Sequence, residues 1–257
     1  MEKIYVNIDN IADIQMEKSN SVMVLGYFDG VHLGHQEVLK SAKQIACKCN
    51  LKLSVLSFFP HPKSVLNKKF TDFYLEPIED RIEKLKKLEV DTFYIVEFNE
   101  RFSKVDPDAF IKDYVLGLGA KHIVCGFDYK YGYKASGNTD TLQKYREIGI
   151  GITIINEQKH CKIKISSTVI RDCLENGEVH HIPHYLGGHY FIKYCSIQGV
   201  LSHYKFPLTG KYKTMLEFEN NSILSFVTID DVKKLHFDCN VSHVKQPIKV
   251  YWLEKVG

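Results

Sequence analysis

The stretch Ser21–Gln36, "SVMVLGYFDGVHLGHQ", decides how the first part of this chain folds. It opens with an apolar run that ends at Gly26, which is typical of a buried strand. The following "HQEVLKSAKQIACKC" places its apolar residues on one helical face. Three glycines and two histidines therefore lie where a strand turns into a long helix. A helix N-terminus offers free backbone N–H groups and a positive dipole end, which favour phosphate.

The same alternation of strands and helices continues to about residue 182. Strands are expected at 51–59, 91–98, 121–127 and 151–158, and helices at 77–88, 106–119, 140–149 and 166–177. Because these strands are almost continuously apolar, they predict an α/β fold with a mostly parallel sheet covered on both faces. Ligands of such sheets bind beyond the carboxyl ends of the strands.

The texture of the sequence changes after Pro183. Short runs rich in aromatic and β-branched residues, such as "SILSFVTI" and "PIKVYWLE", predict a small antiparallel, β-barrel-like domain. We therefore expect two domains, at residues 1–183 and 184–257.

Composition indicates the compartment and the class of partner more than the function. The 257 residues carry a formal net charge of +3, which is too mild to argue for nucleic acid or a membrane surface as a partner. The N-terminus lacks a signal-peptide pattern, and no run approaches the roughly 20 apolar residues that span a bilayer. The seven cysteines are scattered without a CxxC pair, so we expect a cytoplasmic protein with no zinc site and no disulfide. We also expect no obligate protein partner.

The histidines of the opening stretch form an HxGH motif. His32 and His35 are three residues apart, so on a first helical turn they would face the same side. Imidazoles there would stabilise charge on a phosphate in a transition state. Gly30 and Gly34 would let the backbone come close to a ligand.

Four motifs together resemble the nucleotidyltransferase superfamily, and most closely the adenylyltransferase module of the bacterial bifunctional riboflavin kinase/FAD synthetase. They are "GYFDGVHLGH" (26–35), "FFPHP" (58–62), "CGFDYKYGYKASGN" (125–138) and "ISSTVIR" (165–171). The resemblance implies a Rossmann-like nucleotidyltransferase domain and an enzyme that makes FAD and pyrophosphate from FMN and ATP. The FMN phosphate would attack the α-phosphorus of ATP directly, so the protein would act by alignment and electrostatic stabilisation.

The resemblance also implies roles for individual residues. The ATP phosphates would be contacted by a catalytic set comprising His32, His35, Ser167, Thr168 and Arg171, and the ATP pocket would be formed by Gly26, Phe28, Asp29 and Gly34. The flavin site would comprise Pro60, Pro62, Leu66, Asp128 and Tyr131. The prolines and the leucine would form walls, the carboxylate would accept a hydrogen bond from a ring N–H, and the tyrosine would stack. Mg²⁺ is expected with ATP, held largely by phosphates and water, so no protein ligand for a metal is assigned.

The last part of the chain departs from the family pattern. Bifunctional relatives carry a six-stranded riboflavin kinase barrel with a Pro-Thr-Ala-Asn signature, whose threonine and asparagine help bind the nucleotide and its Mg²⁺. Here the stretch reads "FPLTG": Pro207 is retained, but Leu208 replaces the threonine and Gly210 replaces the asparagine. Leucine has no oxygen ligand and glycine has no side chain. We therefore expect a monofunctional FMN adenylyltransferase without riboflavin kinase activity.

Two other functions stay open at this point. Pantetheine-phosphate adenylyltransferases and cytidylyltransferases share the HxGH motif but not the motifs at 58–62 and 125–138, and the identity of the phosphorylated acceptor separates them. The chain could also be a flavin-binding regulator whose altered C-terminal domain is a sensing or interaction module. The complete set of phosphate-contacting residues argues against a pure binder.

Overall fold

The computed structural model describes residues 1–67, 73–219, 221–241 and 244–256, which form two compact units. Unit 1 comprises Met1–Phe28, Gly34–Asp72 and Ile78–Glu157, and unit 2 comprises Asp29–Leu33, Phe73–Pro77 and Gln158–Gly257. This division differs from the expected domains 1–183 and 184–257. Residues 158–183 belong with the C-terminal sheet because their apolar side chains share its core, and two short N-terminal segments join the same unit.

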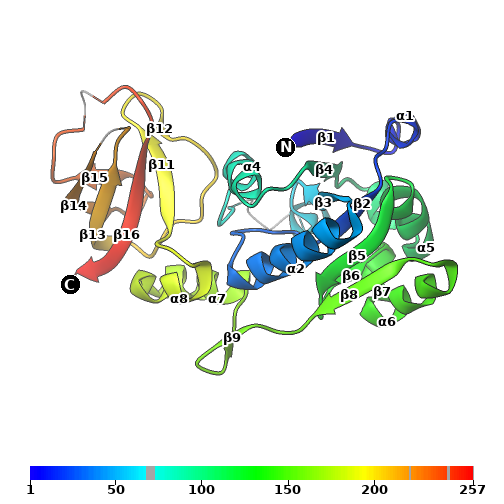
Figure 1. Ribbon diagram of the computed structural model, residues 1–257. Helices are drawn as coiled ribbons and strands as arrows, with labels where there is room; N and C mark the ends of the chain where they lie inside the picture. Colours follow the sequence, from blue (N-terminus) through cyan, green and yellow to red (C-terminus); the bar gives the residue numbers. More distant parts are fainter. Residues whose placement is uncertain (68–72, 220, 242–243, 257) are drawn as a thin grey trace. The chain divides into compact units, whose positions relative to one another are not determined.

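Unit 1 is built on a six-stranded parallel sheet with the order β1-β4-β3-β2-β5-β8 (Figure 1). The strands are β1 (Glu2–Val6), β2 (Ser21–Leu25), β3 (Lys52–Phe59), β4 (Thr92–Glu97), β5 (Ala120–Gly126) and β8 (Gly151–Ile155). All five residues of the central strand β2 are buried, so both faces of the sheet are covered there. Its Val24 pairs with Val55 of β3 and with Val124 of β5. The expected α/β fold with a parallel sheet is confirmed.

Within the described residues, the connections of unit 1 contain helices and a short β-hairpin. The helices are α1 (Ile11–Met16), α2 (Leu33–Cys49, which begins in unit 2), α3 (Pro62–Leu66), α4 (Ile78–Lys87), α5 (Pro107–Ala109) and α6 (Thr139–Leu142). The 3₁₀ turns are η1 (Phe102–Lys104), η3 (Tyr133–Ala135) and η4 (Gln143–Ile148), the π-helical stretch is η2 (Phe110–Leu116), and the hairpin pairs β6 (Lys130–Tyr131) with β7 (Gly137–Asn138). The helices expected at 106–119 and 140–149 are therefore composite.

Unit 2 carries a six-stranded antiparallel sheet with the order β12-β11-β16-β13-β14-β15 (Figure 1). Its strands are β11 (Phe191–Cys195), β12 (Gly199–Val200), β13 (Gly210–Glu217), β14 (Ser222–Ile229), β15 (Leu235–Phe237) and β16 (Ile248–Val256). The sheet is preceded by the hairpin of β9 (Lys159–His160) and β10 (Ile163–Lys164), then by α7 (Ser167–Asn176), η5 (Val179–His181) and α8 (Pro183–Leu186). The expected small antiparallel domain is confirmed.

Helix α7 has a capping residue at each end. The Ser166 side chain accepts a hydrogen bond from the Val169 N–H at 3.4 Å, and Gly177 ends the helix with a left-handed φ of 75°. Its buried residues Ile170 and Leu174 belong to one core cluster with Trp252 of the sheet. Helix α7 is therefore folded as part of the β unit.

Candidate active site

The HxGH motif lies at the start of α2, the helix that follows the central strand of unit 1. His32 directly precedes the helix and is buried in unit 2, whereas His35 lies in the first helical turn and belongs to unit 1. Gly30 has a φ of 85°, and a Cβ added there would lie 3.3 Å from Leu75 Cδ1. This turn therefore favours glycine both for its backbone conformation and for its space.

Asp29 is the centre of the polar network in unit 2. Its side chain is 2% exposed, and Arg171 Nη2 donates to Asp29 Oδ2 at 2.6 Å. Backbone N–H groups of Leu75 and Glu76 donate to the two carboxylate oxygens at 3.3 and 3.0 Å. A buried carboxylate is stable only when it is paired and hydrogen-bonded, and these three donors meet that requirement.

The helix of the fourth motif contacts the same segment at a second point. Ser167 Oγ donates to the Asp29 carbonyl at 2.8 Å, and Arg171 Nη1 donates to the Phe73 carbonyl at 3.0 Å. Thr168, in the first turn of α7, is exposed. Asp29 is thus hydrogen-bonded to two residues that follow it by 138 and 142 positions in the sequence, Ser167 and Arg171. Two nitrogens of the Arg171 guanidinium are engaged by oxygen atoms of the protein itself. Direct contact of Arg171 with a phosphate, as expected from the sequence, stays a prediction.

In unit 1, the residues around Gly26 form a second close-packed group. The Phe28 ring lies 4.9 Å from the His35 ring, measured between centroids. A Cβ added to Gly26 would lie 2.7 Å from Phe28 Cζ, so only glycine leaves room for this ring. Gly34 directly precedes His35 in α2. The structure therefore brings Gly26, Phe28 and His35 together, as the sequence grouping predicts.

Unit 1 also contains an apolar cavity of about 540 Å³. It is lined by Phe58, Pro62, Leu66, Phe98, Phe102, Ser103, Val105, Phe110, Lys130, Tyr131, Gly132, Tyr133, Lys134 and Ala135. Leu66 and Tyr133 are 67% and 45% exposed, so two large apolar side chains at the cavity lie open to solvent. A cavity of this size and lining suits a flat, largely apolar ligand.

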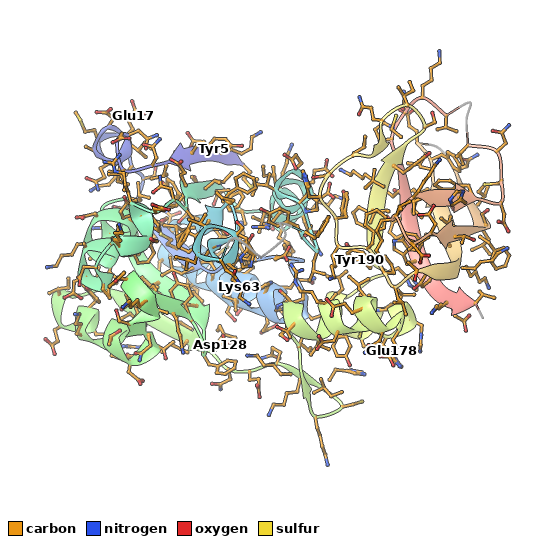
Figure 2. The ribbon with its side chains drawn as sticks, turned by 180° about the vertical axis from the view of Figure 1, so that it is seen from behind. Tyr5, Glu17, Lys63, Asp128, Glu178 and Tyr190 are labelled. Atoms are coloured by element: carbon orange, nitrogen blue, oxygen red, sulfur yellow. The ribbon has the colours of Figure 1, made fainter. Side chains whose placement is uncertain are left out.

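Three of the five residues expected at the flavin site, namely Pro62, Leu66 and Tyr131, line this cavity. Pro60, which follows a cis peptide bond at the end of β3, is not among the lining residues. Asp128 is not among them either, and it is exposed on the loop after β5 (Figure 2). The sequence did not predict that Phe98, Phe102 and Phe110 line the cavity, because their spacing follows no motif. Phe58, in contrast, lies inside the motif "FFPHP".

The orientation of Tyr131 is fixed by a residue that does not itself line the cavity. Its hydroxyl shares a hydrogen bond of 2.9 Å with Thr141 Oγ1. Thr141 in turn forms a capping box with Asn138 at the start of α6. Burial raises the pKa of the Tyr131 phenol, so the ring stays neutral at physiological pH. The ring at the cavity wall is therefore preorganised.

Comparison with known proteins identifies the family. A family model described as FAD synthetase matches residues 14–169. The chain belongs to the FAD synthetase family. A bifunctional riboflavin kinase/FMN adenylyltransferase of Listeria monocytogenes is 44% identical over 200 residues, covering 77% of this chain and 63% of the relative. A bifunctional relative from Bacillus subtilis is 42% identical over 187 residues and is covered over 59% of its length, so the chain spans about three fifths of such proteins.

Another member of the FAD synthetase family matches over most of its own length. A Listeria monocytogenes protein named FAD synthetase is 31% identical over 232 residues, which are 86% of this chain and 93% of that protein. A crystal structure from Streptococcus pneumoniae, described as a macrolide-efflux protein, superposes with a TM-score of 0.86 at 27% identity over 100% of both chains. The likeness to the FAD synthetase family inferred from the motifs is confirmed.

Three further features concern this FAD synthetase family member. Within the described residues, no helix is long and apolar enough to cross a membrane. No group of three or more His, Cys, Asp or Glu able to hold a metal occurs in the same part of the chain. The segment "FPLTG" (206–210) packs on α7, because the Leu208 N–H donates to the Leu174 carbonyl at 2.8 Å. The Leu208 carbonyl accepts a hydrogen bond from the Tyr212 hydroxyl at 2.6 Å.

Proposed function

We propose that this chain is a monofunctional FMN adenylyltransferase, which transfers AMP from ATP to FMN and releases FAD and pyrophosphate. The observation that carries the proposal is the Asp29 network. It joins the strand-to-helix turn of the HxGH motif to the helix of "ISSTVIR" through Ser167 and Arg171. A pure flavin binder has no use for two joined segments that both match phosphate-binding motifs.

The proposed reaction needs no covalent intermediate with the protein. An oxygen of the FMN phosphate forms a bond to the α-phosphorus of ATP, while the bond from that phosphorus to the bridging oxygen of pyrophosphate breaks. Pyrophosphate leaves with the electron pair. His32, His35 and the exposed hydroxyl of Thr168 would stabilise the charge that develops on the phosphates, which is the main term in such catalysis.

The aromatic cavity of unit 1 supports FMN as the acceptor. Its lining by Pro62, Leu66 and Tyr131 matches a ring system that is flat, apolar on both faces and polar at its edges. A bound ring would cover the exposed side chains of Leu66 and Tyr133. Pro60 and Asp128 remain proposed flavin contacts, although neither is among the lining residues.

The residues of this site are compatible with a Mg²⁺ ion that binds together with ATP. Asp29, the buried carboxylate of the network, accepts hydrogen bonds from three N–H groups and is 2% exposed, so it is not a suitable Mg²⁺ ligand. Mg²⁺ would therefore be held by phosphate oxygens and water, as it commonly is. When bound, it would neutralise charge on the triphosphate.

We propose a cytoplasmic location for this activity.

The proposal is tested by incubating the protein with ATP and Mg²⁺, and with FMN, riboflavin or phosphopantetheine in turn. Chromatography then separates the products. FAD from FMN, with no FMN from riboflavin, is the expected result. His32→Ala is expected to abolish the product, whereas the exposed Lys211→Met serves as the matched control.

Each other outcome selects a different function. FMN formed from riboflavin would show that the kinase site survives despite Leu208 and Gly210. Adenylylation of phosphopantetheine in place of FMN would assign the other acceptor class. Flavin binding without any product would favour the regulator.

A further inference from the structure

The turn after β2 has a strained backbone. Phe28 has a φ of 59°, although it is a large non-glycine residue and only 1% exposed. A bulky residue in the left-handed region costs free energy, so neighbouring groups must hold it there. The residue before it, Tyr27, supplies the attachment point.

The carbonyl of Tyr27 accepts two side-chain hydrogen bonds from different elements of unit 1. Ser57 Oγ of β3 donates at 2.8 Å, and Arg81 Nη1 of α4 donates at 2.9 Å. The guanidinium carbon of Arg81 also lies 4.9 Å from the centroid of the Tyr27 ring. Both the carbonyl and the ring of one turn residue are therefore held by the same arginine.

Arg81 occupies a position where a charge is costly. It is 0% exposed, and it stands on the face of α4 that also buries Ile78 and Leu85. Burying a guanidinium is unfavourable unless its hydrogen bonds repay the loss of water. The same helix also buries Asp80. The hydrogen bond and the ring contact of Arg81 with Tyr27 connect this buried cation to the turn.

That turn leads directly to the HxGH motif. The Phe28 ring lies 4.9 Å from the His35 ring, measured between centroids, and it occupies the space that a side chain at residue 26 would fill. We propose that Arg81, assisted by Ser57, is a positioning residue for His35. It acts through the Tyr27 carbonyl and the left-handed conformation of Phe28. The catalytic part of this inference rests on the proposed FMN adenylyltransferase function.

Three variants separate positioning from general stability. Arg81→Met keeps much of the volume but removes every donor, Arg81→Lys keeps one flexible donor and the charge, and Ser57→Ala removes the second donor to the same carbonyl. Arg101→Met is the matched control, because Arg101 forms an exposed ion pair with Asp9 at 3.3 Å in the same unit. Ser57→Ala keeps the test valid if Arg81→Met fails to fold.

Steady-state kinetics of FAD formation give the first result. We expect kcat to fall at least about tenfold in Arg81→Met and less in Ser57→Ala, with KM for ATP within about twofold of the original protein. Arg81→Lys should recover part of the lost kcat, and Arg101→Met should match the original protein. A folded Arg81→Met or Ser57→Ala protein with unchanged kcat would overturn the inference. A loss that appears only in KM would overturn it as well.

An NMR measurement tests the positioning without any activity. The ring current of Phe28 shifts the Cε1–Hε1 signal of His35, which is assigned by its disappearance in His35→Gln. Ser57→Ala and Arg81→Lys should move this signal, while Arg101→Met should leave it in place. An unmoved His35 signal in both variants would refute the positioning. If the unmodified protein makes no FAD but the signal moves, the proposed function fails and the positioning stands.

Discussion

Replacement of Arg171 by methionine tests whether the Asp29 network stabilises unit 2. The substitution removes the guanidinium donor from the Asp29 carboxylate, which is 2% exposed, and keeps the N–H groups of Leu75 and Glu76 as donors. Removing one partner of a buried ion pair costs about 3–5 kcal/mol because the other charge stays buried. The Arg171 side chain is 22% exposed and two amide donors remain, so we expect the lower end, about 3 kcal/mol. For a chain of this size, that loss lowers Tm by about 6–12 °C.

The single tryptophan of the chain makes the assay specific to this unit. Trp252 is 0% exposed and lies in the same core cluster as the α7 residues Ile170 and Leu174, so its fluorescence reports the unfolding of unit 2. A double-mutant cycle with Asp29→Asn should give a coupling energy of about 2 kcal/mol.

The outcome is compared with an exposed ion pair in the same unit. Lys211 Nζ and Asp238 Oδ2 are 2.7 Å apart with side chains 45% and 46% exposed, so Lys211→Met should change stability by less than about 1 kcal/mol. A fluorescence melt of Arg171→Met within about 1 °C of the original protein would refute the reasoning. Additive effects of the Asp29 and Arg171 substitutions would refute it too.

Three further expectations follow from single features. Leu66→Ala should leave Tm unchanged, because this side chain is 67% exposed, but should raise KM for FMN about five- to tenfold through lost contact with the ring. Burial, with a smaller effect of Arg146, lowers the pKa of His122 from its usual 6.5, so the stability it gives is present above that pH and is lost as pH falls through the folded-state pKa. His122→Gln should therefore flatten the dependence of Tm on pH below about 6.5, and an unchanged slope would contradict this. Deletion of residues 184–257 should abolish both soluble expression and FAD synthesis, and a soluble, active remainder would show that α7 folds without the sheet.

Local signals predicted most of the regular structure. The apolar runs predicted five of the six parallel strands. The helix expected at 106–119 does start at this point, because the Asp106 carboxylate caps it by accepting a hydrogen bond from the Asp108 N–H at 2.8 Å. The missing strand was β1 (Glu2–Val6), which has one fully buried residue and therefore little apolar pattern. It joins the sheet through its register with β4, which is a long-range feature.

The site was predictable only as far as its motifs extend. Asp29, Ser167 and Arg171 were all selected from the sequence, but their mutual hydrogen bonds join residues up to 142 positions apart and have no local signal. The amides of Leu75 and Glu76 could not be foreseen, because backbone donors carry no side-chain signature. Arg81 did leave a signal, since it stands three residues after Ile78, in phase with the apolar face of α4.

The packing of α7 gives the C-terminal sheet a structural role in the candidate site. Arg171 must reach the Asp29 carboxylate from a fixed helix, and an isolated ten-residue helix is marginal in water. The core cluster shared by Ile170, Leu174 and Trp252 supplies the tertiary contacts that fix it. The Leu208 N–H also donates to the Leu174 carbonyl near the end of α7, so the segment that contains Leu208 helps to hold the helix. The sheet therefore acts as a scaffold for the helix that carries Ser167 and Arg171.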